Sequence, residues 1–166
     1  RTGGVVEVLY DPGGVFGLFT PWNFPMVIPA WKIAPALAYG NAVLFKPSEI
    51  VPGSAWALTE IIVQAGAPAG LFNLLMGAGP VGATILDHVD AVSFTGSVPT
   101  GRAVAQQATA RMIPAQCELG GKNPLIVTAS ADLDVAVDCA IQGSFYQTGQ
   151  RCTASSRLVV DEEVAE

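Results

Sequence analysis

Short apolar segments alternate with longer helix-like segments along the whole chain, and this alternation is the strongest constraint on its fold. The segment AVLFK (42–46) is a continuous apolar run, typical of a strand buried on both faces. We expect further strands at residues 5–10, 14–19, 71–76, 91–95, 112–117, 125–129 and 156–160. Helices are expected at residues 26–38, 54–64, 80–87, 98–110 and 132–147. Repeated strand–helix–strand units predict an α/β fold with a parallel sheet and helices on both faces.

Glycine and proline residues set the limits of these elements. The turn Asp11-Pro12-Gly13 joins the first two strand segments, so we expect either a hairpin or two successive strands there. Gly40 and Gly66 follow helix-like segments and suit the left-handed conformation that ends a helix. In a parallel sheet, ligands bind beyond the carboxyl ends of the strands. We therefore expect the functional residues in KPSE (46–49), FTGS (94–97) and ELGGKN (118–123).

The composition argues against a membrane protein. The chain has 166 residues, enough for one domain with a core, and it is 51% hydrophobic and only 13% charged. That balance indicates a sheet buried on both faces, a surface covered by further protein, or both. The most apolar region, residues 26–45, is interrupted by Pro29, Lys32, Pro35 and Gly40, so it lacks the roughly 18 to 20 uninterrupted apolar residues of a membrane span. No membrane span and no secretory segment are expected.

Charge and cysteine content narrow the possible partners. The net charge is −6, and the 8 basic residues form no stripe, so we expect no nucleic-acid partner. The three cysteines lack a metal-binding spacing such as CxxC, and His88 is the only histidine, so we expect no metal site. An odd number of free cysteines favours a reducing, cytoplasmic location.

The segment GSVPTG, from Gly96 to Gly101, lies between a predicted strand and a predicted helix. Its two glycines have the spacing of a phosphate-binding loop, but Arg102 follows where such a loop needs lysine. Amides at the start of a helix, together with the Ser97 hydroxyl, can hold a phosphate. A purely structural glycine turn explains the same residues, and the motif alone does not decide between the two.

The segment KPSE places Lys46 and Glu49 three positions apart at the end of a predicted strand. A carboxylate there can bind both hydroxyls of a ribose and would repel a 2′-phosphate, which favours NAD over NADP. An exposed salt-bridging turn is the alternative interpretation.

Two further side chains are candidates for chemistry. Glu118 follows an apolar strand that ends in Cys117, and burial at that point would raise its pKa into the range of a general base. A solvated loop acid fits the glycines that follow it equally well. Cys152, in GQRCTASS (149–156), would need an activated thiolate and donors for an oxyanion in order to act as a nucleophile.

The surroundings of Cys152 in the sequence offer partial support for that role. Arg151 carries a charge that favours a thiolate, and Asn23 in PWNFP (21–25) is a candidate oxyanion donor on a loop pinned by prolines. Cys117 and Cys139 are interpreted as packing residues. On the residues alone, Cys152 remains either a spare thiol in a loop or the nucleophile of an enzyme.

Taken together, the motifs PWNFP, KPSE, FTGS, ELGGKNP and GQRC resemble those of the aldehyde dehydrogenase superfamily in order and approximate spacing. The resemblance covers essentially the whole chain, and ELGGKNP and GQxC are its most specific parts. It implies that Cys152 is the nucleophile that attacks the aldehyde, that Asn23 and the Cys152 backbone N–H form the oxyanion hole, and that Glu118 is the base that activates water. GQRCTASSR and PAWKIAPALAYGN look closest to bacterial semialdehyde dehydrogenases of the 2-oxoglutarate-semialdehyde type.

The resemblance also implies a cofactor site and a domain division. The cofactor would be NAD, with NADP as a possibility, and the substrate a small aldehyde. Its contacts are implied at Trp22, Lys46, Ser48, Glu49, Gly96, Ser97, Gly101, Leu119 and Gly120. We expect a variant Rossmann cofactor-binding domain at residues 1–118 and the start of a catalytic domain, with the cysteine, at residues 119–166.

Members of the superfamily are much longer than this chain, so the resemblance implies a truncated form of a homo-oligomeric parent enzyme. Two hypotheses of different class follow. In the first, the longer parent is an NAD(P)-dependent aldehyde dehydrogenase that oxidises an aldehyde to an acid through a cysteine thioester. In the second, the chain is a nucleotide-binding module with little or no catalytic turnover.

Overall fold

The computed structural model describes residues 4–165, which divide into two compact units between Glu118 and Leu119. The first unit is built on a five-stranded sheet with the strand order β3-β2-β1-β4-β5. The strands are β1 (Val15–Phe19), β2 (Ala42–Lys46), β3 (Phe72–Leu74), β4 (Ala91–Gly96) and β5 (Ala115–Leu119). The pairs β1–β2, β1–β4 and β2–β3 are parallel, which confirms the predicted fold class.

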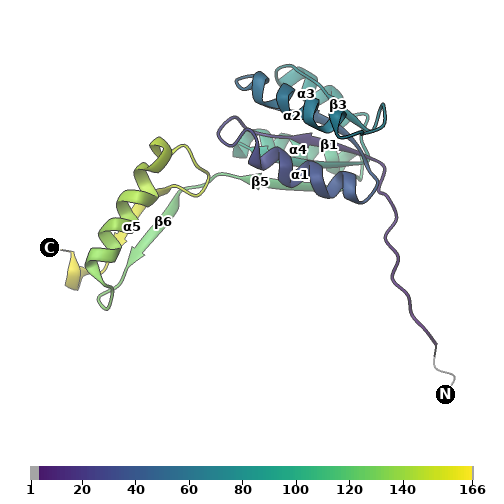
Figure 1. Cartoon of the computed structure of the whole chain (residues 1–166). Coiled ribbons are helices and arrows are strands. Elements are labelled where there is room, and N and C mark those ends of the chain that lie inside the picture. Colours follow the sequence, from purple (N-terminus) through teal and green to yellow (C-terminus); the bar gives the residue numbers. More distant parts are fainter. Residues whose placement is uncertain (1–3, 166) are drawn as a thin grey trace. The chain divides into compact units, whose positions relative to one another are not determined.

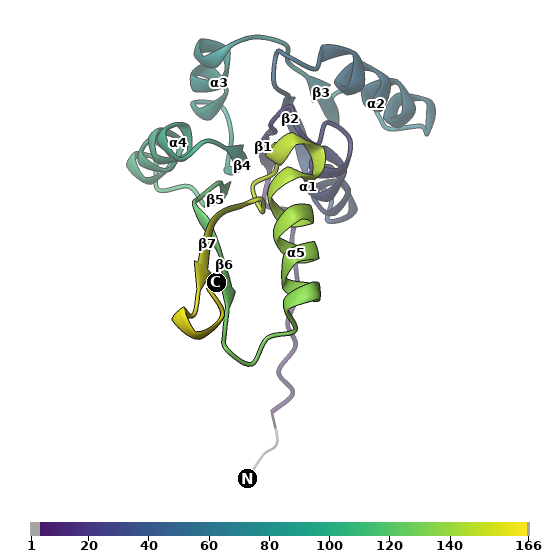
Figure 2. The same ribbon diagram turned by 90° about the vertical axis from the view of Figure 1, so that its left-hand side faces the viewer.

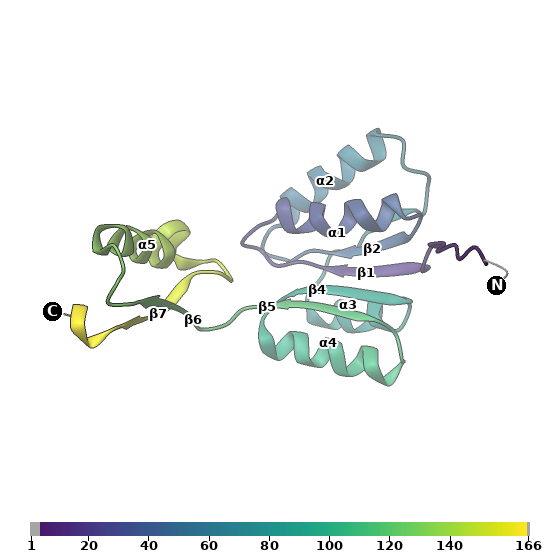
Figure 3. The ribbon, with the colours of Figure 1, turned by 90° about the horizontal axis from the view of Figure 1, so that it is seen from below.

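Four helices cover this sheet, two on each face (Figure 3). They are α1 (Val27–Ala38), α2 (Pro52–Gln64), α3 (Gly79–Leu86) and α4 (Val98–Ala110). The helices α1 and α2 lie on one face of the sheet, and α3 and α4 lie on the other (Figure 3). The predicted helices are thus confirmed, and Gly40 and Gly66 take the expected left-handed φ of 78° and 93° after α1 and α2.

Alternating side chains of the central strands form two hydrophobic clusters, one under each pair of helices. Leu18 of β1 packs with Val43 and Phe45 of β2 in the cluster that also contains residues of α1 and α2. The next residue of β1, Phe19, points the other way and packs with β4, α3 and α4. Because successive side chains of a strand face opposite sides, one short apolar run supplies both clusters. The residues that follow these strands are thereby held at the carboxyl edge of the sheet.

The predicted strand at residues 5–10 is wrong. Residues 4–14 form no helix or strand, and the side chains of Val5, Val6, Val8, Leu9 and Tyr10 are 71–96% exposed (Figure 1). The hairpin with residues 14–19 is also absent, because β1 lies between β2 and β4 and is parallel to both. Alternating β-branched residues favour an extended chain, but a strand also needs a free neighbouring edge. Both edges of β1 are already occupied.

The second unit is a single β–α–β arrangement. Strand β6 (Asn123–Val127) pairs in parallel with β7 (Ser155–Val160), with an irregularity between Asn123 and Pro124. Helix α5 (Leu133–Phe145) connects them and packs beside β7 (Figure 2). Its first turn is capped by the Asp132 carboxylate, which accepts a hydrogen bond from the Val135 N–H. The short 3-10 turns η1 (Tyr146–Gly149) and η2 (Glu162–Val164) complete the unit. Within residues 4–165, no helix is both long and apolar enough to cross a membrane.

Candidate functional site

A cleft of about 350 Å³ lies in the first unit at the carboxyl ends of β1, β2 and β4. The order of strands reverses between β1 and β4, because β2 and β3 extend the sheet on one side while β4 and β5 extend it on the other. Such switch points are where doubly wound sheets bind ligands. Of the predicted cofactor residues, six line this cleft: Trp22, Lys46, Ser48, Glu49, Gly96 and Ser97.

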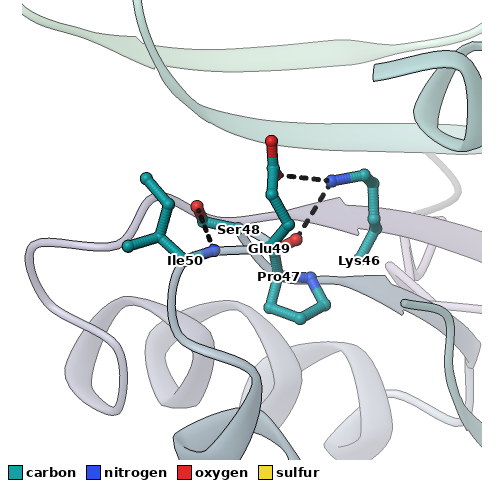
Figure 4. Close-up of polar contacts among 5 residues, drawn as sticks. All are labelled: Lys46, Pro47, Ser48, Glu49 and Ile50. Atoms are coloured by element: carbon teal, nitrogen blue, oxygen red, sulfur yellow. Dashed lines mark hydrogen bonds and ion pairs between the residues drawn. The ribbon is translucent and has the colours of Figure 1, made fainter. Parts of the chain in front are cut away.

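The end of β2 supplies the charged wall of the cleft (Figure 4). The Lys46 side chain is buried, and its Nζ donates a 3.0 Å hydrogen bond to the Pro47 carbonyl. Its other contact is the Glu49 carboxylate, with 3.8 Å between Nζ and Oε2. The Glu49 side chain is 57% exposed, so an ion pair of this length contributes little to stability and leaves carboxylate lone pairs for a ligand. The two interpretations of KPSE, a salt-bridging turn and a ligand-binding segment, are therefore compatible.

The loop between β4 and α4 forms a second wall. Ser97 is the N-cap of α4, and its Oγ accepts a hydrogen bond from the Thr100 N–H. Pro99 has no N–H, so this helix start offers a ligand fewer amide donors than the sequence motif suggested. The hydroxyls of Ser97 and Thr100 lie 2.9 Å apart and both residues line the cleft. Gly101, by contrast, is buried within α4 and is not one of the residues that line the cleft.

Some cleft residues escaped the sequence analysis. Gly82 of α3 lines the cleft. A Cβ at this position would lie 3.4 Å from both Lys46 Cδ and Phe19 Cε1. A glycine at this position lets α3 approach the stem of Lys46, and the GPVG segment at 79–82 was its only sequence signal. Thr20 is another: its hydroxyl is buried and makes no hydrogen bond to the described residues. No pattern in the sequence singles it out.

Asn23 and Glu118 lie at other points of the first unit. Asn23 is half-buried in the loop between β1 and α1, next to the cleft residue Trp22. Glu118 is exposed near the end of β5, and its Oε1 accepts a 2.9 Å hydrogen bond from Gln116 Nε2. Of the two interpretations of Glu118 left open by the sequence, the exposure agrees with a solvated acid and not with burial. The reason is that β5 is an edge strand of the sheet, with exposed residues at 115, 116, 118 and 119.

Cys152 lies in the turn that leads from η1 into β7, within the second unit, and it is exposed. Its backbone carbonyl accepts a 2.6 Å hydrogen bond from Asn123 Nδ2, which also donates to the Ala154 carbonyl at 3.1 Å. The asparagine of the ELGGKNP motif thus fixes the backbone of the cysteine turn. This link between two distant motifs was not predicted.

The Arg151 guanidinium contacts backbone carbonyls and an aromatic ring. It donates to the carbonyls of Gln142 and Gly143 at 2.8 and 2.9 Å, and it lies 5.2 Å from the centre of the Tyr146 ring. It therefore ties the turn to the C-terminal end of α5. The backbone just before it is strained, because Gln147 and Thr148 both have φ of 56°.

The other two cysteines differ from each other. Cys117 is half-buried against the cluster beneath α3 and α4, with its Sγ 3.9 Å from the Gly101 carbonyl oxygen, as expected of a packing residue. Cys139 is exposed on α5, so its interpretation as a packing residue is wrong. Helix α5 has no buried residue, because the small second unit covers none of its faces fully. Leu119, Gly120 and Cys152 belong to this second unit, and all three are exposed.

The described part of the chain contains no candidate metal site. Among residues 4–165, no three His, Cys, Asp or Glu side chains gather closely enough to hold an ion. The first unit carries the cleft, and the second unit carries the cysteine turn.

The first unit, with its doubly wound parallel sheet and a cleft at the switch point, has an α/β fold of the class that binds ligands at the carboxyl ends of its strands. The chain belongs to the aldehyde dehydrogenase family, whose model matches residues 2–166. It is 48% identical over 159 residues to retinaldehyde dehydrogenase 3 of Mus musculus, covering 93% of this chain and 31% of that protein. It is 46% identical to the alpha-ketoglutaric semialdehyde dehydrogenase of Bacillus subtilis, covering 93% of this chain and 32% of that protein.

Solved structures agree with the family assignment. The NAD+ complex of an aldehyde dehydrogenase from Bacillus cereus matches with a TM-score of 0.88 and 41% identity, covering 92% of this chain and 32% of that one. The betaine aldehyde dehydrogenase of Staphylococcus aureus in complex with NAD+ matches with a TM-score of 0.89 and 42% identity, covering 92% of this chain and 31% of that one. The chain thus spans about a third of the length of the curated relatives it matches.

Proposed function

We propose that these residues are the cofactor-binding and cysteine-bearing part of an NAD(P)-dependent aldehyde dehydrogenase, which oxidises a small aldehyde to a carboxylic acid. The observation that carries the proposal is the switch-point cleft, where six of the predicted cofactor residues converge in a chain of this family. The test is formation of NADH or NADPH by the complete protein that contains these residues, with NAD and with NADP and a panel of aldehydes and semialdehydes. Absence of both reduced cofactors with every aldehyde would refute the proposal.

The cleft fits a dinucleotide in its donor and acceptor groups. The Glu49 carboxylate would accept hydrogen bonds from the hydroxyls of the adenosine ribose, with the Lys46 ammonium and Ser48 beside it. The Ser97 hydroxyl at the start of α4 would face a phosphate, and Gly96 would leave room for it. Trp22, Leu119 and Gly120 complete the proposed cofactor residues, while Gly101 does not line the cleft and is proposed only as part of the Gly96–Gly101 segment. NAD, when bound, supplies the acceptor for a hydride, and NADP would have to place its 2′-phosphate against Glu49.

The proposed chemistry assigns one role to each candidate catalytic residue. The Cys152 thiolate bonds to the aldehyde carbon, and the resulting oxyanion is held by Asn23 Nδ2 and the Cys152 N–H. NAD, when bound, would accept a hydride from that carbon, and Cys152 would then carry the acyl group as a thioester. Water then attacks the thioester carbon, Glu118 takes the proton of that water, and the carbon–sulfur bond breaks to release the acid and restore the thiolate.

Glu49→Gln should change the choice of cofactor. In the unaltered protein NAD should bind more tightly than NADP, because the Glu49 carboxylate accepts charge-assisted hydrogen bonds and repels a 2′-phosphate. The variant should bind NAD roughly tenfold more weakly and narrow the gap to NADP, since it loses one charged acceptor. Calorimetric titration with both dinucleotides measures this. Glu60→Gln, on the exposed side of α2, is the matched control and should change neither affinity. Tighter binding of NADP by the unaltered protein would show that the ribose assignment is wrong.

Gly96→Ala should obstruct the proposed cofactor cleft. A Cβ at residue 96 would lie 2.6 Å from Cζ of Phe94, whose ring is buried in the core cluster. The ring must shift, which costs roughly 1–3 kcal/mol of stability and narrows the cleft. We expect a lower melting temperature and at least tenfold weaker NAD binding. Gly53→Ala in α2 is the control, because nothing lies within 4 Å of a Cβ there; it should raise stability by about 0.5–1 kcal/mol. Equal NAD affinity in the Gly96→Ala and unaltered proteins would exclude Gly96 from the site.

A second candidate function is favoured by the division of the chain. Glu118 and Cys152 belong to different compact units, and the second unit exposes large apolar side chains on α5, β6 and β7. The chain of 166 residues, taken alone, would then be a nucleotide-binding module with little turnover. NAD binding without aldehyde oxidation by this chain, alongside turnover by the complete protein, is the expected result. Robust turnover by the 166-residue chain would contradict it.

The remaining proposals concern the setting of the enzyme. A cytoplasmic location agrees with three free cysteines. A homo-oligomeric complete protein is proposed from the family alone. Neither a nucleic acid nor a membrane is a proposed partner, because the net charge of −6 repels both anionic surfaces. Cell fractionation and light scattering of the complete protein test these points.

A further inference from the structure

A polar cluster on one side of the sheet connects Glu118 to a lysine on α1. Its members are Lys32 of α1, Ser93 of β4, and Gln116 and Glu118 of β5, all within the first unit. We propose that Ser93 and Gln116 are positioning residues that hold the Glu118 carboxylate in one orientation. This inference rests on the proposed function, in which Glu118 activates water.

The hydrogen bonds of the cluster run in one direction. Lys32 Nζ donates to Ser93 Oγ at 2.6 Å, and Ser93 Oγ donates to Gln116 Oε1 in a short hydrogen bond. Gln116 Nε2 then donates to Glu118 Oε1 at 2.9 Å. Since a lysine ammonium can only donate, each group down the chain has its donor and acceptor fixed. The last group, Glu118, is left with the role of acceptor, which a carboxylate fulfils best.

Lys32, at one end of this series of hydrogen bonds, sets their direction. Burial of the Lys32 side chain lowers its pKa, and this effect is opposed by electrostatic interactions with Glu118 and Cys117, which raise it. Lys32 Nζ also lies 3.5 Å from Gln116 Oε1, so the amide oxygen of Gln116 is drawn toward the lysine. The amide nitrogen of Gln116 must therefore face Glu118. Hydrogen bonds that follow one another in this way polarise each other, and a cation at one end strengthens an anion at the other.

Backbone geometry places Gln116 where this contact requires it. Residues two apart on a strand share a face, so Gln116 and Glu118 project to the same side of β5. Glu118 is exposed and has three rotatable side-chain bonds, so a partner is needed to keep it in one orientation. A base displaced by about 1 Å can lose roughly a hundredfold in rate.

The test compares two matched variants of Ser93 in the complete protein. Ser93→Thr keeps the hydroxyl, and Ser93→Val has the same shape without it. Gln116→Met, of similar length to glutamine, removes the amide. We expect Ser93→Val and Gln116→Met to lower kcat for aldehyde oxidation by roughly tenfold to a hundredfold, with KM for NAD unchanged. Ser93→Thr should restore most of the rate. The first-turnover burst of NADH should survive in all three, because hydride transfer precedes the step that needs Glu118.

Three outcomes are distinguishable. Unchanged kcat in Ser93→Val and Gln116→Met, with an active unaltered protein, overturns the inference alone. Equal loss in Ser93→Thr and Ser93→Val also overturns it, since the hydroxyl would then be irrelevant. Formation of neither NADH nor NADPH by the unaltered protein with any aldehyde refutes the proposed function instead. In that case crystal structures of the same variants test the series of hydrogen bonds. Glu118 should keep one conformer in Ser93→Thr and lose it in Ser93→Val. A single Glu118 conformer in both variants overturns the inference.

Discussion

Cys152→Ala should abolish aldehyde oxidation by the complete protein, with a loss in kcat of at least about 10⁴-fold. Alanine has no nucleophile, so no covalent adduct with the aldehyde can form and no hydride can leave from it. The backbone of the turn should survive, because Asn123 Nδ2 holds it through the carbonyls of residues 152 and 154 and not through the sulfur. NAD binding should therefore change by less than about twofold, as the cleft lies in the other unit.

Cys139→Ala is the matched control for that experiment. Both cysteines are exposed and both belong to the second unit, but Cys139 lies on α5. A limiting alkylating agent followed by peptide mapping gives an independent measurement. Cys152 should be modified ahead of Cys139 and Cys117 in the complete protein, and NAD should alter its rate of modification. Full activity in Cys152→Ala, or equal labelling of Cys152 and Cys139, would contradict the role proposed for Cys152.

The predictions were right for elements whose local sequence pattern suits the neighbours that they have in the fold. The run AVLFK at 42–46 is β2 because strands on both sides bury it, and the helix at 98–110 begins at Ser97, a residue type that caps helices. The segment at 5–10 has the period-two pattern of a strand but forms no strand, so the local pattern alone gave a wrong prediction there. Strand formation depends on a partner that local sequence does not specify.

Burial was the weaker part of the sequence-based interpretation. One of the two interpretations of Glu118 placed it in a buried position because an apolar strand precedes it, but that strand is at the edge of the sheet. Cys139 was expected to pack because it lies in a helix with apolar neighbours, but the second unit is too small to cover that helix. In both cases the side chain's environment is set by which element lies beside it, and this is a property of the topology.

The candidate site was predictable where its residues follow strands, and unpredictable where they meet through space. Lys46, Glu49, Gly96 and Ser97 converge because parallel strands end at the same edge. Ser93 lies 61 positions from Lys32 along the chain, and Gln116 lies 84 positions from it. No local motif marks such contacts, and only the packing of α1 against this side of the sheet creates them.

Phe45→Ala should cost this chain about 3–5 kcal/mol of unfolding free energy, a large part of the roughly 5–15 kcal/mol available to a domain. The Phe45 side chain is 0% exposed in the cluster beneath α1 and α2, and its ring centre lies 5.9 Å from that of Phe72. Truncation removes buried surface and leaves a cavity that the neighbouring strands cannot close fully. Urea denaturation followed by circular dichroism measures the change.

Trp31→Ala is the control that separates burial from size. Tryptophan is larger than phenylalanine, but the Trp31 side chain on α1 is 72% exposed, so its loss should cost less than about 1 kcal/mol. A second readout connects the core to the cleft. Because Phe45 directly precedes Lys46 on β2, loss of its packing should also weaken NAD binding under conditions where the variant remains folded. If Phe45→Ala and Trp31→Ala cost the same, the cluster would not be what holds Lys46 and Glu49 at the edge of the sheet.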